Sequence, residues 1–349
     1  MYDAILLVSF GGPEKPEDVM PFLENVTRGR NVPHERLLEV VEHYQHFGGR
    51  SPINDQCRTL IRALRAELDA HSIHLPIYWG NRNWRPLLAD TLRQMRDAGI
   101  QRALAFVTSA FSSYSSCRQY LENITAAQAE LGEGAPHIHK LRVFYNHPRF
   151  IESWVDQVRR ALDQFSEDER RKLRFVATAH SIPRALAATS AYEKQLRETA
   201  GLVAQSLGLR EWDLVFQSRS GPPAQPWLEP DILDHLRALA ATGVKNILLA
   251  PIGFISDHLE VLYDLDTEAS TLAHDLGLKL VRAETVATHP CFIAMIRELI
   301  SERLNPAEPK QAMGAFGPSR DVCPADCCPA PQQAGRPPAS EGPSASRRS

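Results

Sequence analysis

The sequence lacks several signals that place a protein quickly in a functional class. No apolar run approaches the roughly 20 residues that a membrane-spanning helix needs. The start, Met1-Tyr2-Asp3, leads directly into a strand-like run without a basic region or cleavage site, so we expect no secretory signal and a cytoplasmic protein. The 39 lysines and arginines do not outnumber the 42 aspartates and glutamates, which argues against a nucleic-acid partner.

Motifs for nucleotide binding and acyl transfer are also missing. No G-x-G-x-x-G follows a strand-like run, and no Walker loop or G-x-S-x-G elbow occurs. The glycine pairs in "FGGP" (10–13) and "FGGRSP" (47–52) are more typical of turns than of phosphate cradles. We therefore expect no nucleotide cofactor, and hydrolases rank low among the candidate functions.

Short apolar runs alternate with amphipathic helical segments along most of the chain. This alternation predicts an α/β protein with parallel sheets covered on both faces. We expect two similar Rossmann-like, doubly wound halves with a cleft between them, over residues 1–140 and 141–304, and a last helix near 290–304 that can pack back on the first half. The expected strands lie near 4–10, 76–80, 102–111, 140–145, 172–180, 213–218, 246–252 and 278–284.

One predicted strand ends in a histidine. In "VATAHSIPRAL" (176–186) the strand-like run stops at His180, and a turn follows. Ligands of open α/β sheets bind outside the carboxyl ends of the strands, where His180 would lie. A histidine that only closes the strand by hydrogen bonding explains the pattern equally well as a base or a metal ligand.

A second stretch, "PIGFISDHLEVLYDLDTEAS" (251–270), places three carboxylates at regular spacing. Glu260, Asp264 and Glu268 recur at i, i+4 and i+8, on one face of a helix. A solvated acidic face is one interpretation, and a ladder of oxygen ligands for a divalent cation is the other. Imidazole and carboxylate together suit Fe²⁺, and neutral imidazole accepts protons near pH 7.

Three of the six cysteines lie together near the C-terminus. Cys323, Cys327 and Cys328 occur in "DVCPADCCP", within a segment from about residue 305 that is rich in proline, serine, alanine and glycine. That composition predicts disorder apart from the cysteines. In a reducing compartment such a cluster more often binds metal than forms disulfides, although a tail with adventitious thiols is the alternative.

Five segments carry a family resemblance. "LLVSFGGP", "FGGRSPIN", "ATAHSIP", "VFQSRSGPPAQPWLEPD" and "PIGFISDHLEVLYDLDTE" resemble, in order, the signature segments of ferrochelatases. The segment "SAFSSYSSCRQY" (109–120), together with the C-terminal cysteines, is most similar to the actinobacterial type, the coproporphyrin III ferrochelatases. The resemblance implies a lyase-type metal chelatase of haem biosynthesis, with Fe²⁺ as a substrate and coproheme as the product.

The same resemblance assigns roles to the polar residues. The proton acceptor and metal-site histidine of the family falls on His180 and its partner glutamate on Glu260, while Asp264 and Glu268 match its acidic ladder. Two pyrrole N–H protons must leave before four nitrogens can bind iron, and the macrocycle must be bent to expose its lone pairs. A base at a strand end would serve that chemistry.

Porphyrin contacts are expected from matching segments. Candidates for the four propionates and the ring are Arg28, Arg30, Tyr44, Ser51 and Tyr120, because hydroxyls and the arginine fork suit carboxylates. Each arginine could equally be a solvated surface charge. Some family members carry a tyrosine before the first glycine of "GGP"; here Phe10 stands there and cannot ligate metal.

The family also implies an iron–sulfur cofactor. Some members hold a [2Fe–2S] cluster with three C-terminal cysteines and one internal cysteine, which here would be Cys323, Cys327, Cys328 and Cys117. Cys57 or Cys291 could replace one of these ligands, although a buried apolar role suits both better.

The sequence allows more than one substrate and more than one function. Protoporphyrin IX could replace coproporphyrin III, and a non-catalytic carrier of tetrapyrrole or metal could use the same cleft. Cobalt or nickel chelation is a further alternative, against which the "DHLEVLYD" segment argues. We expect a monomer that receives iron from an unknown donor and hands coproheme to a processing enzyme.

Overall fold

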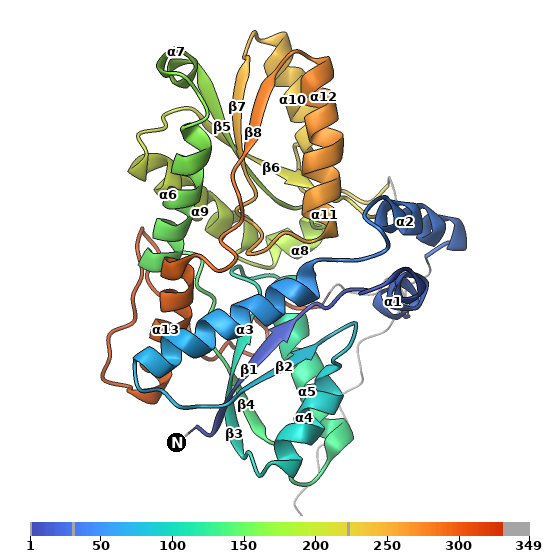
Figure 1. Ribbon diagram of the computed structural model, residues 1–349, viewed down its shortest axis with the longest axis vertical. Coiled ribbons are helices and arrows are strands. Elements are labelled where there is room, and N and C mark those ends of the chain that lie inside the picture. The colour runs from blue at the N-terminus through green and yellow to red at the C-terminus, as the bar shows by residue number, and fades with distance from the viewer. Residues whose placement is uncertain (1, 30–31, 222–223, 331–349) are drawn as a thin grey trace, which may run out of the picture.

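The computed structural model describes residues 2–29, 32–221 and 224–330 of the chain. Two parallel four-stranded sheets form its centre, with the strand orders β2-β1-β3-β4 and β6-β5-β7-β8 (Figure 1). The predicted α/β class with two similar halves is therefore confirmed. The strands are β1 (Ala4–Ser9), β2 (Ile77–Asn81), β3 (Arg102–Val107), β4 (His137–Lys140), β5 (Leu173–His180), β6 (Trp212–Gln217), β7 (Asn246–Ala250) and β8 (Lys279–Arg282).

Helices cover both faces of each sheet, as expected where every crossover joins parallel strands. Two of the helical segments, η2 and η3, are π-helices, and η1 is a 3₁₀ turn. The bounds are η1 (Pro16–Asp18), α1 (Val19–Val26), α2 (His34–His46), α3 (Ile53–Ala70), α4 (Leu88–Asp97), η2 (Tyr114–Arg118), α5 (Gln119–Leu131), α6 (Pro148–Leu162), α7 (Glu167–Arg171), α8 (Arg184–Ala188), α9 (Tyr192–Ser206), α10 (Ile232–Ala241), α11 (Leu259–Val261), η3 (Leu262–Ala269), α12 (Ser270–Asp275) and α13 (Pro290–Leu304).

The strands are buried on both faces, which explains their nearly continuous apolar sequences. In β1, Ile5 and Leu7 belong to a large core that reaches into both halves, whereas Leu6 and Val8 contact a separate core beneath α4 and α5. Over the described residues, no helix is both long and apolar enough to cross a membrane.

The last helix joins the two halves. It follows the strand β8 of the second sheet, yet α13 packs against α3 of the first half as well as against α6 (Figure 1). An ion pair of 2.9 Å between Arg297 Nε on α13 and Glu67 Oε1 on α3 accompanies this packing. The helix thus couples the two halves.

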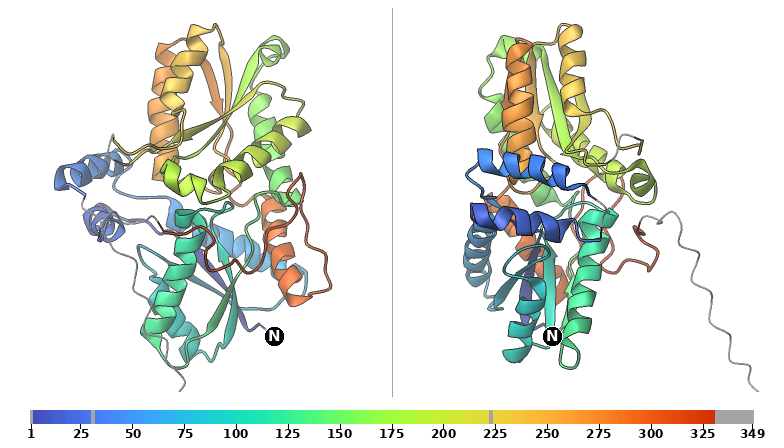
Figure 2. Two further views of the ribbon diagram at one scale, coloured as in Figure 1. Left: turned by 180° about the vertical axis from the view of Figure 1, so that it is seen from behind. Right: turned by 90° about the vertical axis from the view of Figure 1, so that its right-hand side faces the viewer.

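Two predictions about irregular segments are wrong. The run "KLRVFY" (140–145) was expected as a strand, but β4 ends at Lys140 because Arg142 turns into a buried ion pair with Glu302 of α13. Residues 305–330, named here the C-terminal strap, were expected to be disordered. They have no regular structure but pack across the junction of the halves (Figure 2).

Backbone hydrogen bonds hold the strap in place. Met313 N donates to Asn146 O at 2.8 Å, and Asn146 Nδ2 donates to the carbonyls of Met313 and Gly317. Ala315 N donates to Glu198 Oε1 on α9 at 2.6 Å. These polar contacts substitute for the apolar burial that the strap's composition cannot supply. The expected tail beyond it, residues 331–349, lies outside the described residues.

Candidate functional site

His180 ends β5 with one ring nitrogen hydrogen-bonded and the other free. Its Nδ1 contacts the Ser181 carbonyl oxygen, which can only accept, so Nδ1 carries the proton. Nε2 lies 3.6 Å from Glu260 Oε2, a distance at which the two groups form an ion pair once Nε2 takes up a proton. The Tyr192 hydroxyl donates to His180 O at 3.0 Å and fixes the strand end.

A glycine lets the loop after β7 approach this strand end. A Cβ atom on Gly253 would lie 2.5 Å from the Ala179 Cβ, so only glycine fits. Gly253 N donates to Thr178 O at 3.0 Å. The close contact places the segment that leads to Glu260 beside His180.

His258 fixes the start of that segment. It is the N-cap of α11, and its Nδ1 accepts a hydrogen bond from Glu260 N at 3.2 Å. Burial lowers the pKa of His258, partly against the raising effect of Glu260, and His180 lowers it further. A neutral imidazole here keeps its accepting lone pair and holds the backbone of Glu260.

The three carboxylates predicted on one helical face do not lie on a regular α-helix. Glu260 sits in the short α11, whereas Asp264 and Glu268 lie in the π-helix η3. π-Helical segments are rare and frequently occur at functional sites. The charges of Glu260 and Glu268 both act on Asp264, so the structure brings the three carboxylates together.

Asp264 is the most perturbed of these carboxylates. Burial raises its pKa to about 7, and Glu260 and Glu268 add to the rise, while a hydrogen bond from the Ser218 hydroxyl opposes it. Gln217 Nε2 lies 3.5 Å from Asp264 Oδ2. Asp264 can therefore bind or release a proton near neutrality, and Glu268, whose pKa burial also raises, lies next in line toward solvent.

Aromatic residues of the first half meet this ladder from the other side. The His43 and Tyr263 rings stack at 3.8 Å between α2 and η3. Tyr44 is buried nearby: burial raises its pKa, and the charge of Glu260 raises it further. Phe10 lies edge-on to Phe22 at 6.2 Å, within an apolar cluster that includes Tyr44. The second-half carboxylates thus face an apolar wall from the first half.

The other expected porphyrin contacts are more scattered. Ser51 is buried under Gly12, and its hydroxyl accepts from Ile53 N at 3.4 Å. Tyr120 is buried beneath the Arg82 guanidinium, which lies 4.4 Å from its ring centroid. Arg28 is exposed after α1. Arg30 lies outside the described residues.

Sequence reasoning did not single out His258 or Ser218. His258 lies inside the acidic motif, and its place two residues before Glu260 is the signal of an N-cap contact. Ser218 has a φ of 60°, a left-handed conformation that is uncommon for serine and orients its hydroxyl toward Asp264.

The four cysteines assigned to a cluster line one cavity of about 220 Å³ between η2, β4 and the strap. A hydrogen bond from Cys117 lowers the pKa of the Cys323 thiol, and the Cys327 and Cys328 sulfurs lie 3.7 Å apart. Cys57 and Cys291 do not line this cavity. Its other polar lining is mainly cationic, from Arg118, Lys140 and Arg303, while burial lowers the pKa of the lining His139 and Asp321 adds one carboxylate.

Four thiols surrounded by cations are a fitting donor set for an iron–sulfur cluster, because thiolates are its usual ligands and cations offset their charge. In the described part of the chain, however, no group of three or more histidine, cysteine, aspartate or glutamate side chains is arranged to hold a metal ion. The cysteine side chains would have to turn toward a common centre to bind one.

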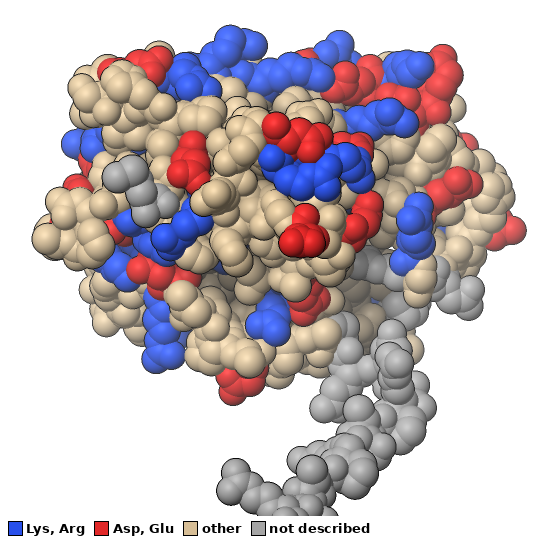
Figure 3. Space-filling model, turned by 90° about the horizontal axis from the view of Figure 1, so that it is seen from below, with Lys and Arg blue, Asp and Glu red and all other residues tan. Residues whose placement is uncertain are grey.

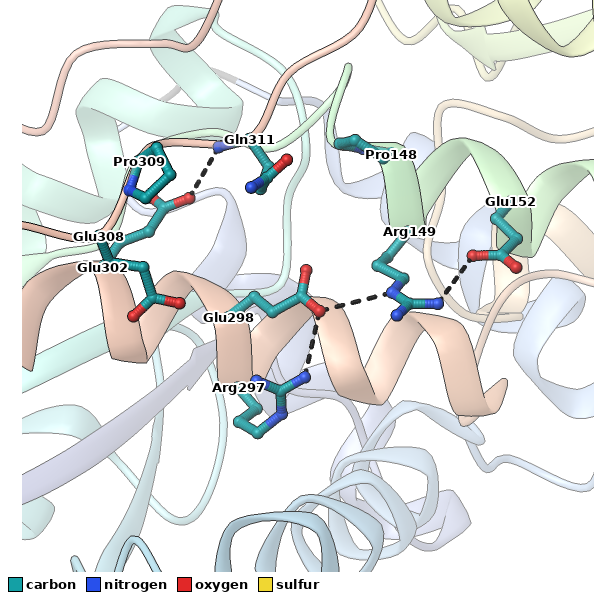
Figure 4. A pocket seen from close by; sticks show the side chains of 9 residues that line it. All are labelled: Pro148, Arg149, Glu152, Arg297, Glu298, Glu302, Glu308, Pro309 and Gln311. Carbon is teal, nitrogen blue, oxygen red and sulfur yellow. Dashed lines mark hydrogen bonds and ion pairs between the residues drawn. The ribbon is translucent and has the colours of Figure 1, made fainter. Parts of the chain in front are cut away.

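A larger cavity of about 430 Å³ lies between α6, α13 and the strap (Figure 4). Its charged groups pair with one another: Glu298 contacts Arg149 at 3.4 Å and Arg297 at 3.1 Å, and Arg149 contacts Glu152 at 3.2 Å. Charges of both signs are likewise interspersed on the face in Figure 3. Neither this cavity nor the face in Figure 3 therefore carries an extended surface of one charge sign.

Relatives of this chain are numerous. The ferrochelatase family profile matches residues 2–304. A ferrochelatase of Rhodopirellula baltica is 56% identical over 328 residues, which are 94% of this chain and 93% of that protein. Coproporphyrin III ferrochelatases of Frankia alni and Streptomyces coelicolor are 51% and 50% identical, over 95% and 94% of this chain and 87% and 94% of theirs.

Solved structures agree on the fold. SirB from Bacillus subtilis with Fe³⁺ aligns with a TM-score of 0.53 at 12% identity, over 87% of this chain and 98% of that one. The family match and the identities of 50% and more show that the chain belongs to the ferrochelatase family, the lyase-type metal chelatases that insert iron into a porphyrin in haem biosynthesis.

Proposed function

We propose that this enzyme inserts Fe²⁺ into coproporphyrin III to give coproheme, with His180 and Glu260 as the catalytic pair. The observation that carries the mechanism is the free Nε2 of His180, 3.6 Å from Glu260 Oε2 at the carboxyl end of a sheet. The choice of coproporphyrin III is supported by relatives of that name at 50% and 51% identity.

Proton removal begins at His180. The Ser181 carbonyl holds the proton on Nδ1, so Nε2 accepts a pyrrole proton without a change of tautomer. Glu260 then stabilises the imidazolium by charge. Since two pyrrole protons must leave, the pair needs an outlet, and Asp264, with a pKa of about 7, is matched to take a proton and pass it on toward Glu268.

Iron uses the same polar groups. Imidazole and carboxylate oxygens suit Fe²⁺, and we assign His180, Glu260, Asp264 and Glu268 as the residues that contact the metal on its way to the ring. If only two or three of these four residues bind the metal at one time, coordination positions stay open, which allows the metal to be transferred to the four pyrrole nitrogens. As protons leave, the negative charge that remains attracts the cation.

Porphyrin binding falls to the first half. Phe10 and Tyr44 belong to one apolar cluster, and we assign them as the surface against which the ring is bent by binding energy from its periphery. Arg28, Arg30, Ser51 and Tyr120 remain our assignments for the propionates and the rim. Ser51 and Tyr120 are buried here, so contact with a propionate would need the neighbouring loops to open.

The decisive assay is anaerobic Fe²⁺ insertion, run in parallel on coproporphyrin III and protoporphyrin IX and followed by loss of porphyrin fluorescence. Fast turnover on the first and little on the second supports the proposal, and the reverse preference makes the enzyme a protoporphyrin ferrochelatase. Tight binding of both without turnover would favour a carrier.

Variants test the catalytic pair. His180→Ala should lower turnover by about 10²–10⁴-fold, the usual contribution of a general base, while porphyrin binding persists. Glu260→Gln should also lower turnover severely, because the imidazolium of His180 loses its charge partner. His274→Ala, an exposed histidine on α12, is the matched control. Wild-type turnover in His180→Ala would remove that residue from catalysis.

We also propose that Cys117, Cys323, Cys327 and Cys328 hold a [2Fe–2S] cluster, supported by their common cavity and its cationic lining. Bound there, the cluster would supply one-electron redox chemistry and tie the strap to η2, which carries Cys117. Cys323→Ser should abolish the visible absorbance and the bound sulfide of anaerobically purified protein, whereas Cys291→Ala should keep both. Unchanged absorbance in Cys323→Ser would exclude that ligand.

We place the enzyme in the cytoplasm as a monomer that hands coproheme to a processing enzyme. Size-exclusion chromatography with light scattering would test the monomer, and a dimer mass would contradict it.

A further inference from the structure

Arg282 bridges two carboxylates from separate segments of the second half. Its Nε and Nη2 donate to the two carboxylate oxygens of Asp266 at 2.5 and 2.8 Å, and its Nη1 donates to Asp257 Oδ1 at 3.1 Å. The Arg282 side chain is 15% exposed, whereas the Asp257 and Asp266 side chains are 25% and 39% exposed, so the guanidinium is the more buried member of both pairs. Such a bidentate fork fixes direction as well as distance.

The two partners bracket the proposed catalytic residues in sequence. Asp257 lies just before the segment that carries Glu260, and its carbonyl oxygen accepts from Gln56 Nε2 of α3 at 2.6 Å. Asp266 lies in the π-helix η3, midway between Asp264 and Glu268. Arg282 therefore contacts the chain on both sides of Glu260: at Asp257, before it, and at Asp266, between Asp264 and Glu268.

The π-helix is anchored at both edges of the second sheet. β6 and β8 are the outer strands in the order β6-β5-β7-β8. Just beyond β6, Ser218 holds Asp264, and at the end of β8 Arg282 holds Asp266. His180, at the end of β5, lies between these two anchors. A π-helix is intrinsically unfavourable, so contacts of this kind are needed to keep its register.

We propose that Arg282 is a positioning residue that fixes the register of η3 and thereby sets the distances of Glu260 and Asp264 from His180. The inference rests on the proposed roles of those three residues. Arg282 itself touches no reacting group. Its guanidinium acts through Asp266 and Asp257, so its loss should affect the chemical step more than porphyrin binding.

The test compares Arg282→Met with a control that loses an equally buried ion pair elsewhere. The Arg297 side chain is 16% exposed, and its Nε lies 2.9 Å from Glu67 Oε1. This ion pair joins α13 to α3 and does not involve η3. Arg297→Met should keep wild-type turnover. Arg282→Met should lower kcat by about ten- to a hundredfold, the effect of a misplacement of about 1 Å at a reacting centre.

Three further readouts separate positioning from general destabilisation. The KM for Fe²⁺ should rise in Arg282→Met, whereas the Kd for coproporphyrin III, from fluorescence quenching, should stay within about twofold of wild type. Arg282→Lys keeps the charge without the fork and should recover part of kcat. Asp266→Asn combined with Arg282→Met should be no worse than Arg282→Met alone, because both act through one contact.

Two results would overturn the inference: a kcat within about twofold of wild type in Arg282→Met, or equal losses in Arg282→Met and Arg297→Met. If Arg282→Met does not fold, Arg282→Lys and Asp266→Asn carry the same test. His180→Ala and Glu260→Gln are assayed alongside. Full turnover in those two variants would refute the proposed function itself, and their inactivity beside a fully active Arg282→Met would refute only the role of Arg282.

Discussion

Replacing Asp264 by asparagine should stabilise the protein at alkaline pH while it slows the enzyme. Burial, reinforced by Glu260 and Glu268, raises the pKa of this carboxyl from 3.8 to about 7. A folded-state pKa above the unfolded one means that the native state holds the proton more tightly, so wild-type stability falls as pH rises from about 4 to about 7. Asparagine never ionises and avoids this loss.

The size of the effect follows from the displaced pKa. At ~1.4 kcal/mol per pKa unit, the ionised carboxylate destabilises the fold by at most ~4 kcal/mol above pH 7, and water that reaches the site reduces this to ~2 kcal/mol. Asparagine keeps an oxygen that accepts from Ser218, so the variant loses little hydrogen bonding. Because part of this loss has already occurred at pH 5, wild type should lose ~1 kcal/mol relative to Asp264→Asn between pH 5 and pH 8.

Urea unfolding of the metal-free protein at pH 5 and pH 8 measures this difference. Asp275→Asn, at an exposed position on α12, is the control and should follow wild type at both pH values. Anaerobic turnover of Asp264→Asn should fall, because the proton outlet is lost. Parallel pH dependences of stability in wild type and Asp264→Asn would refute the reasoning.

Two further substitutions probe the frame around the site. Arg142→Met leaves the Glu302 carboxylate, whose side chain is 3% exposed, without its cationic partner. The free energy of unfolding should fall by ~3–5 kcal/mol, measured by the same urea titration. The double variant Arg142→Met with Glu302→Leu should recover most of this loss. Gly253→Ala forces a methyl against Ala179 and should lower both the melting temperature, through ~1–3 kcal/mol of overpacking, and kcat; a fully active, equally stable variant would contradict this.

The fold was predictable because parallel strands that are buried on both faces have nearly continuous apolar sequences. Runs such as "NILLA" in β7 are buried along their whole length, and that continuity, with helical periodicity between the runs, is what the sequence displays. The segment at 140–145 looks equally apolar but is not a strand. There Arg142 finds its partner in Glu302, 160 residues later, and no local pattern reports such a pair.

The site was predictable only to the level of residue types. His180 and the carboxylates could be singled out because strand ends and regular spacing are local features. The π-helix was not, since its extra residue per turn depends on contacts of Ser218 and Arg282 with its carboxylates. The strap was missed for a similar reason: its ordering depends on Asn146, a residue far away in the sequence.

The two halves share a topology but divide the proposed chemistry between them. β1 and β5 hold the same place in their sheets, so the end of β1, Ser9 followed by Phe10, corresponds to the end of β5 at His180. An apolar ring stands at one strand end and a base at the other. In the proposed mechanism this asymmetry divides the work, because the ring packs against the apolar strand end of the first half and loses its protons to the base at the strand end of the second half.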